Sequence, residues 1–269
     1  MNSPLQSNFL YSCEEQWKRG HEQFIAEHAL GYIVSGESHF HTNDGVLVFG
    51  AGMIGLIRRN QLAKTVKVPS ADGKPFKSIN IFLDQESLKQ YSIDHDMPAQ
   101  KPYTGDKFIP LTHDKFIKSY FDSLLPYFDE PAQLTPALMV LKTREAIELL
   151  LRTRPELKAL LFDFSEPHKI DLEAFMNQHF TYNVPLSKFA RMTGRSLATF
   201  KRDFKKVFEL APEKWLQQKR LEKAHYLISQ RNQSPATAYL DAGFENLSHF
   251  SNSFKKFYGY NPSSLKQGS

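Results

Sequence analysis

Apolar residues near the end of the chain follow helical spacing twice in quick succession. In the first segment they recur at i, i+3 and i+4, as Leu186, Phe189 and Ala190. Pro185 suits the first turn of that helix, and Gly194 breaks it after about two turns, where glycine tolerates a positive φ. Ser196 is a good N-cap for a second helix, whose apolar side carries Leu197, Phe200 and Phe204. The pattern predicts two short helices joined by a tight turn, a helix-turn-helix.

This pattern is repeated later in the chain. Residues 200–206, FKRDFKK, have a counterpart fifty positions on in residues 250–256, FSNSFKK. Gly194 and Gly243 are offset by forty-nine, so the second copy has one extra residue in its turn. Ser234 and Pro235 suit the N-cap and first position of its first helix. A repeat of this period indicates one supersecondary unit used more than once.

Two further helices are predicted around these copies. Residues 212–230 read as one continuous helix with Trp215 on its buried side. At about 1.5 Å per residue it would be roughly 27 Å long, enough to hold two units about one turn of B-DNA apart, roughly 34 Å. Asp171 caps a helix that opens this region, with the apolar positions Leu172, Phe175 and Met176.

Earlier in the chain the hydrophobic pattern is typical of β-strands and not of helices. Short runs of aliphatic and aromatic residues between positions 28 and 83 are separated by turn signals such as Asn43-Asp44-Gly45. They predict a small β-barrel or jelly roll within residues 20–110, with 88–108 as irregular connection. Two helices follow, over 112–128 and 137–152. Their predicted buried positions are Ile117, Phe121, Leu124 and Phe128, then Val140, Ile147, Leu150 and Leu151.

The predicted fold class is therefore α+β, with two domains. Residues 1–165 would form the first domain, made of the small barrel at 20–110 and the helical pair at 111–153. Residues 166–269 would form an all-α domain in which a linker helix joins two helix-turn-helix units. The helical pair would bury its apolar stripes on the barrel, on each other or on a second subunit.

Charge is distributed unevenly between these two parts. Residues 171–269 hold 15 Lys and Arg against 8 Asp and Glu, a net +7, and the rest holds 19 against 21, a net −2. This is the distribution expected for a domain that contacts phosphates. Apolar runs are too short for a transmembrane helix, and the N-terminus lacks the features of a signal peptide, so we expect a cytoplasmic protein. Cys13 is the only cysteine, which excludes an internal disulfide.

The last hundred residues resemble the DNA-binding domain of AraC/XylS-type transcriptional regulators. The matching positions are Leu186, Phe189, Ala190, Gly194, Ser196, Phe200, Arg202, Phe204 and Lys205; then Pro212, Trp215, Leu216, Arg220, Leu221, Ala224 and Leu227; then Gly243, Phe244, Phe250, Phe254, Lys255, Lys256, Gly259, Pro262 and Ser263. A weaker resemblance links residues 30–37, LGYIVSGE, to the cupin-like sensor domain that often precedes it. The resemblance implies a regulator, most simply an activator, that binds double-stranded DNA and RNA polymerase. It also implies a sensor and dimerisation role for residues 1–165, with a small-molecule or protein effector and a possible homodimer, without a cofactor.

The family motif also implies which residues approach DNA. Base-reading positions would be Ala198, Lys201 and Arg202 in the first unit and Ser248, His249 and Asn252 in the second. Backbone contacts would come from Ser196, Lys205, Lys206, Asn246 and Lys255. The second unit departs from the family pattern, because Thr237 and Tyr239 replace an acidic residue and an alanine, and Tyr239 would crowd the helix crossing. We therefore expect the first unit to carry most of the sequence specificity.

A competing hypothesis is a cupin-type metal-dependent enzyme or metal sensor fused to the DNA-binding domain. His39 and His41 would face the same side of a strand, as in the His-x-His pair that holds a metal in cupin enzymes. No glutamate follows at the expected short distance, so polar strand residues or pocket lining are the favoured interpretation. No Ser-His-Asp arrangement, phosphate-binding glycine loop or carboxylate pair stands out, and we expect no enzyme activity.

Overall fold

A computed structural model describes residues 8–19, 24–42, 45–97, 103–165 and 168–267. The chain divides into two compact units, Met1–Ser165 and Glu166–Ser269. The expected turn residues Asn43 and Asp44, and residues 166 and 167 of the expected junction, lie outside the described residues.

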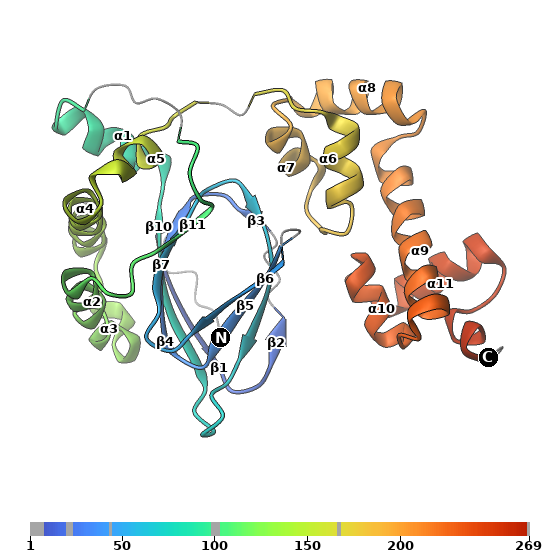
Figure 1. The fold of residues 1–269 in the computed structure, drawn as a ribbon, viewed down its shortest axis with the longest axis horizontal. Coiled ribbons are helices and arrows are strands. Elements are labelled where there is room, and N and C mark those ends of the chain that lie inside the picture. Colours follow the sequence, from blue (N-terminus) through green and yellow to red (C-terminus); the bar gives the residue numbers. More distant parts are fainter. Residues whose placement is uncertain (1–7, 20–23, 43–44, 98–102, 166–167, 268–269) are drawn as a thin grey trace. The chain divides into compact units, whose positions relative to one another are not determined.

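Antiparallel strands form the body of the first unit (Figure 1). The largest sheet has the order β1 (Phe9–Glu14), β10 (Phe76–Leu83), β4 (His28–Ser35), β7 (Ile54–Ile57) and β11 (Phe108–Pro110). A second sheet has the order β2 (Lys18–Arg19), β9 (Lys64–Val68), β5 (Glu37–Thr42) and β6 (Gly45–Gly50), and β3 (Phe24–Ile25) pairs with β8 (Gln61–Leu62). The chain passes from the first sheet to the second at Gly36, whose φ is +75° and whose Cβ would lie 2.4 Å from the Val68 carbonyl oxygen. Only glycine fits there.

The first unit is thus β-rich, as predicted from its alternating pattern. Among the described residues, β1 and β11 are the outer strands of the large sheet, and β2 and β6 those of the second. Between the sheets, the rings of Phe40 and Phe49 lie 5.0 Å apart, and those of Phe49 and Phe108 lie 4.4 Å apart. Closure of these sheets into a barrel stays a prediction.

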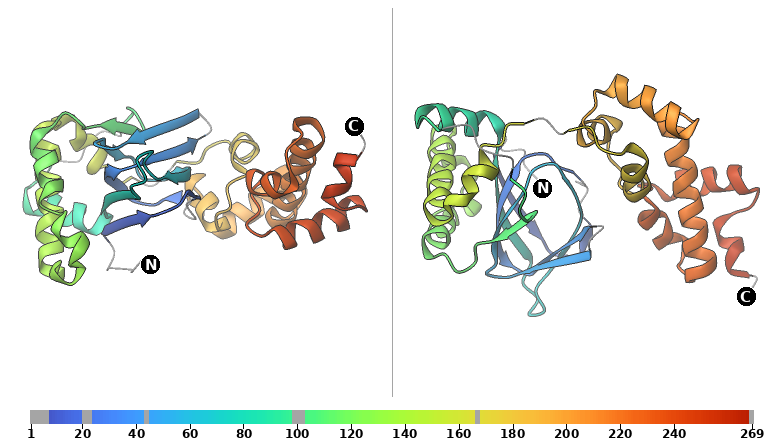
Figure 2. Two further views of the ribbon diagram at one scale, coloured as in Figure 1. Left: turned by 90° about the horizontal axis from the view of Figure 1, so that it is seen from below. Right: turned by 45° about the horizontal axis from the view of Figure 1, so that its top comes forward.

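Helices gather on one side of the large sheet, as the views in Figures 1 and 2 agree. They are α1 (Gln85–Asp94), α2 (Lys115–Asp122), α3 (Pro126–Asp129), η1 (Pro131–Gln133), α4 (Pro136–Thr153), η2 (Pro155–Leu157) and α5 (Lys158–Leu161). Their apolar positions, such as Ile117, Phe121 and Ile147, form one core cluster with Leu30 and Ile79 of the sheet. The sheet supplies the apolar surface that these amphipathic helices need to bury.

Three details of this helical layer differ from the sequence prediction. The segment at 88–108 was expected to be irregular, but α1 forms in its first part, capped by the Asp84 side chain, which accepts from the Ser87 N–H. The predicted helix 112–128 is broken, because α2 ends at Asp122 and α3 begins at Pro126, which has no N–H to continue the hydrogen-bond ladder. Val140, predicted to be buried, is 56% exposed, and Met139 and Thr143 face the core instead.

The second unit is all-helical, as predicted. It comprises α6 (Leu172–His179), α7 (Leu186–Met192), α8 (Leu197–Phe208), α9 (Pro212–Arg231), α10 (Pro235–Ala242), α11 (Leu247–Tyr258) and η3 (Pro262–Gln267). Pro185 stands at the N-cap of α7, one position before its predicted place in the first turn. The helix α9 matches the prediction over its full length and packs against α8 at one end and against α10 and α11 further along (Figure 1).

Aromatic residues form the core on which both helix pairs are built. Phe189, Phe200 and Phe204 are fully buried in the first pair, and the Phe204 ring lies 5.5 Å from that of Trp215 on α9. Phe250 and Phe254 are fully buried in the second pair, beside Ala224 and Ile228 of α9. Burial of one such ring contributes about 1.5–3 kcal/mol, so the repeat of phenylalanines fixes which sides of α8 and α11 face inward.

Candidate nucleic-acid interface

The outward side of α8 presents the cationic side chains predicted for the first unit. The helix begins at the N-cap Ser196, whose hydroxyl oxygen accepts from the Thr199 N–H at 3.2 Å. With Phe200 and Phe204 inward, the opposite side is solvent-exposed, and it carries Ala198, Lys201, Arg202, Lys205 and Lys206. Lys205 and Lys206 lie in the last turn, where positive charge interacts favourably with the helix dipole.

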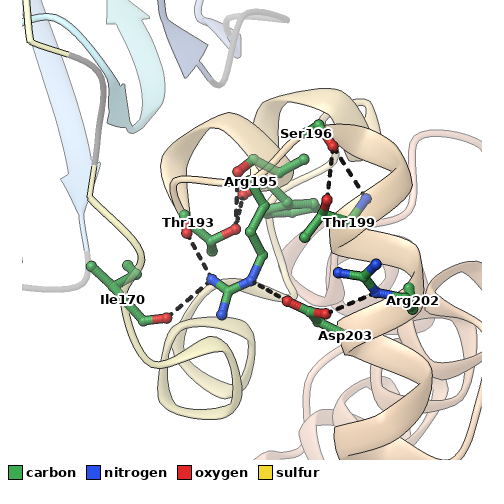
Figure 3. A network of polar contacts seen from close by, with 9 residues as sticks. Ile170, Thr193, Arg195, Ser196, Thr199, Arg202 and Asp203 are labelled. Carbon is green, nitrogen blue, oxygen red and sulfur yellow. Dashed lines mark hydrogen bonds and ion pairs between the residues drawn. The ribbon is translucent and has the colours of Figure 1, made fainter.

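A largely buried arginine, Arg195, contacts α8 through Asp203 (Figure 3). The side chain of Arg195 is 10% exposed. Its guanidinium donates to the carbonyl oxygens of Ile170 at 3.1 Å and Thr193 at 2.7 Å, and to the Asp203 carboxylate at 3.2 Å. These contacts join the segment before α6, the turn after α7 and the middle of α8. Arg195 therefore fixes α8 to the rest of its unit.

Asp203 contacts a second arginine on its other carboxylate oxygen. The Arg202 Nε lies 3.5 Å from Asp203 Oδ1, while Arg195 Nε lies 3.2 Å from Asp203 Oδ2. Burial raises the pKa of the Asp203 carboxyl, but the hydrogen bonds from Arg195 and Arg202 outweigh it and hold that pKa below its ordinary value. The carboxylate is therefore charged at neutral pH and lies between two guanidinium groups.

Lys201 also contacts a carboxylate, from a different helix. Its Nζ lies 2.9 Å from Oε1 of Glu213, in the first turn of α9. The hydrogen bond from Lys201 lowers the pKa of Glu213, so the Glu213 carboxylate is charged at neutral pH. Both side chains are about half exposed, and such surface pairs contribute only about 0–1 kcal/mol. The contact can therefore be exchanged for another anion at little cost.

The outward side of α11 is polar but carries less charge. Asn246 caps the helix, because its side-chain oxygen accepts from the His249 N–H at 2.9 Å. Ser248, His249, Asn252 and Lys255 are all exposed beyond it. The expected crowding by Tyr239 does not expose this core. Its ring lies 6.2 Å from that of Phe250, at the edge of a cluster in which Phe250 and Phe254 are fully buried.

A cleft of about 670 Å³ lies between the two helix pairs, bounded by the start of α7, one side of α9 and the start of α11. Arg220 of α9 borders it and donates to the carbonyl oxygens of Phe180 and Tyr182, both at 2.8 Å, and to Asn183 Oδ1 at 3.2 Å. Burial lowers the pKa of Arg220 to about 10, against the raising effect of the Glu245 carboxylate. Arg220 thus ties the loop before α7 to the linker helix.

Three residues of this network of polar contacts were not predicted from the sequence: Arg195, Asp203 and Glu213. Arg195 and Asp203 are eight residues apart on either side of a helix start, and Lys201 and Glu213 are twelve apart on different helices. Neither spacing is a local helix spacing. A carboxylate inside an otherwise cationic helix face was the one available signal, and it marks Asp203.

The histidine pair of the first unit lies on β5. His39 Nε2 is 2.8 Å from Glu37 Oε2, a glutamate that precedes the histidine pair in the sequence. Within the part of the chain that the structure describes, no three His, Cys, Asp or Glu side chains gather in an arrangement suited to a metal.

Two family models match the chain. One, described as a helix-turn-helix domain, matches residues 189–268, and one, described as the ExsA N-terminal regulatory domain, matches residues 28–162, half of the chain. The chain belongs to the AraC family of transcription regulators. This membership makes it a regulator rather than an enzyme, and the metal-dependent enzyme hypothesis is dropped.

Relatives within the AraC family cover parts of the chain. The regulator ExsA of Pseudomonas aeruginosa is 33% identical over 135 residues, 49% of each chain. The virulence regulon transcriptional activator VirF of Yersinia enterocolitica is 34% identical over 95 residues, 35% of each chain. The chain thus matches half or less of the length of these curated relatives.

Solved structures give a broader but more distant likeness. An apo ToxT variant of Vibrio cholerae aligns with 98% of this chain and 99% of its own, at 11% identity and a TM-score of 0.45. The C-terminal domain of the response regulator yesN of Fusobacterium nucleatum aligns with 35% of this chain and 93% of its own, at 26% identity and a TM-score of 0.34. Among the described helices of this AraC-type chain, none is long and apolar enough to span a membrane.

Proposed function

We propose that the protein is a sequence-specific transcription activator that reads two successive major-groove segments with α8 and α11. One observation carries this proposal: the two capped helices stand fifty residues apart on one linker helix, each with its aromatic side buried and its polar side exposed. The net charge of +7 over residues 171–269 favours contact with the phosphate backbone.

The exposed residues divide into two roles in this proposal. Base edges would be contacted by Ala198, Lys201 and Arg202 of α8 and by Ser248, His249 and Asn252 of α11. Phosphates would be contacted by Ser196, Lys205, Lys206, Asn246 and Lys255. Ser196 and Asn246 use their oxygen atoms as helix caps, so their proposed contribution is to place the helix N-terminus, with its free N–H groups, against a phosphate.

The first unit would control this activity by binding a small molecule or a protein, and its sheets would close into a small barrel around the aromatic residues between them. The exposed Val140 and Leu141 on α4, 56% and 62% exposed, support contact with a second copy of the chain. Pairing of two copies would raise DNA affinity through effective concentration. Activation would require contact with RNA polymerase, and it is supported by the likeness to VirF, a transcriptional activator.

A binding selection with the full-length protein tests this function. Randomised duplexes would be selected at two salt concentrations, and the recovered motif placed before a reporter transcribed by purified RNA polymerase. We expect an asymmetric motif with two half-sites about one helical turn apart, a steep salt dependence and more transcript in the presence of protein. Salt-dependent binding without any motif would refute the reading mechanism, and a motif with reduced transcript would refute activation alone.

A further inference from the structure

Two carboxylates beside the outward side of α8 contact its two proposed base-reading cations in different ways. We propose that Asp203 is a positioning residue that orients Arg202 toward DNA, whereas Glu213 competes with DNA for Lys201. This inference rests on the proposed function, because it concerns how α8 reads DNA. Removing the charge of Asp203 should weaken DNA binding, whereas removing the charge of Glu213 should strengthen it. Charge repulsion from DNA alone would make both changes strengthen binding.

The contact between Asp203 and Arg202 is compatible with DNA binding. Asp203 Oδ1 lies 3.5 Å from Nε of Arg202, so both Nη groups at the outer end of the guanidinium stay available. Those groups form the fork that pairs with O6 and N7 of guanine. The Arg202 side chain is 65% exposed, and Asp203 restrains it from the helix side. Such preorganisation lowers the ordering cost of the base contact.

Asp203 is itself held in place, which an orienting group requires. Its Oδ2 accepts from Nε of Arg195 at 3.2 Å, and Arg195 is fixed by the carbonyl oxygens of Ile170 and Thr193 (Figure 3). Because Arg195 is 10% exposed, this support is largely shielded from solvent. The chain of contacts therefore runs from the body of the unit through Asp203 to an exposed arginine.

The contact between Lys201 and Glu213 has the opposite consequence. A lysine has a single ammonium group, and here it lies 2.9 Å from the Glu213 carboxylate. Any base or phosphate that takes the ammonium must displace Glu213, which then stays near the DNA as an unpaired negative charge. Glu213 therefore weakens binding to every duplex, and it does so more strongly the more tightly it binds the Lys201 ammonium.

The second unit lacks this arrangement. At the positions fifty residues after Lys201, Arg202 and Asp203 stand Ser251, Asn252 and Ser253. Ser253 accepts from the Gln217 amide at 3.3 Å, a neutral contact, where Asp203 pairs with two arginines. The two carboxylates therefore act on the first unit, for which we expect the greater sequence specificity.

The test compares Asp203→Asn and Glu213→Gln in the full-length protein. The probes are the duplex motif recovered from the selection, its single base-pair variants and a scrambled duplex. The matched control is Glu209→Gln, which removes the same charge at the far end of α8. Arg202→Ala, alone and with Asp203→Asn, shows whether Asp203 acts through Arg202.

We expect Asp203→Asn to weaken binding to the motif by about 5-fold. Of the base-pair preferences, it should reduce only the one that Arg202→Ala also reduces. On the scrambled duplex, and in the Arg202→Ala background, Asp203→Asn should not weaken binding. Glu213→Gln should strengthen binding to all duplexes by about 2- to 5-fold, because Lys201 is released. Glu209→Gln should change the affinity for all duplexes equally and by less than about 2-fold.

Several results would overturn the inference. If Asp203→Asn changes binding to all duplexes as little and as evenly as Glu209→Gln, the positioning role is refuted. A uniform loss on every duplex, accompanied by a lower melting temperature, would show that Asp203 only supports the fold. Unchanged binding by Glu213→Gln would refute competition for Lys201. Wild-type protein that binds the motif no better than the scrambled duplex would instead refute the proposed function, before any variant is compared.

Discussion

The two helix-turn-helix units share one scaffold and differ on the side that faces away from it. Corresponding positions fifty residues apart have the same structural role: Ser196 and Asn246 cap a recognition helix, Phe200 and Phe250 are buried, and so are Phe204 and Phe254. Each recognition helix ends at a residue in the left-handed conformation, Glu209 or Gly259. The caps are held by local hydrogen bonds, and the buried phenylalanines by packing against α9.

The outward positions are not constrained in this way, and there the units diverge. The first unit carries Lys201, Arg202 and Asp203 where the second carries Ser251, Asn252 and Ser253. The difference teaches that two units built on the same pair of buried phenylalanines can present either a cationic helix restrained by carboxylates or a nearly neutral polar one. Specificity can therefore change in one unit without altering how either unit folds.

The largest expected effect is the loss of stability on removing a buried phenylalanine, and it tests whether the two units are packed equally well. Phe204→Ala and Phe254→Ala each remove a fully buried ring, so each should lower the free energy of unfolding by about 3–5 kcal/mol. Chemical denaturation of the full-length protein, followed by circular dichroism, measures both. Val207→Ala, at a 44% exposed position on α8, is the control and should change stability by less than about 0.5 kcal/mol. A much smaller loss for Phe254→Ala would mean that the second unit is packed less tightly than the first.

This equivalence could be predicted from the sequence because it depends on local signals. The phenylalanine spacing, the N-caps and the glycine turns each act within one or two helical turns, and they located α7, α8, α10 and α11. The helix α1 was missed because only Leu88 and Tyr91 mark its buried side in a polar, proline-punctuated segment. Its cap, Asp84, was a local signal that could have revealed it.

The polar contacts around α8 could not be predicted in the same way. The contact of Arg195 with Ile170 joins residues twenty-five positions apart, and its direction depends on how α6 packs beside α8. Lys201 meets Glu213 only because α9 leaves α8 at a particular angle after the left-handed residue Glu209. The sequence indicated which side chains are exposed but not which of them touch.

The next effect tests whether the two recognition helices contribute unequally to specificity. Arg202→Ala should cost about 1–3 kcal/mol of discrimination at one base pair, because a guanidinium can pair with guanine through two hydrogen bonds. Asn252→Ala, the matched change on α11, should cost less than about 1 kcal/mol, since we expect the second unit chiefly to position the domain. Competition binding with single base-pair variants of the motif measures both. Equal losses for the two variants would remove the proposed division between the units.

A smaller effect concerns the left-handed residues that end the recognition helices. Gly259 has a φ of +86° with open space around its Cβ position, so Gly259→Ala should cost about 1 kcal/mol through backbone strain alone. Glu209 has a φ of +58°, and Glu209→Gly should stabilise the protein by up to about 1 kcal/mol. Thermal unfolding measures both changes. Destabilisation by Glu209→Gly would show that its side chain makes a contact worth more than the strain.

The smallest expected effect is a change in the salt dependence of DNA binding, and it tests whether both units contact phosphates in the same way. Lys205 and Lys255 stand fifty residues apart in the last turn of α8 and α11, and both are exposed. If each contacts one phosphate, Lys205→Ala and Lys255→Ala should each reduce the slope of log affinity against log salt by about 0.9. Titrations of the full-length protein at several salt concentrations, on the motif and on a scrambled duplex, measure the slopes. The reduction should be the same on both duplexes, because a phosphate contact carries no sequence information. A reduction for Lys205→Ala alone would mean that α11 does not approach the backbone at this point, and the difference between the units would then extend from base reading to docking.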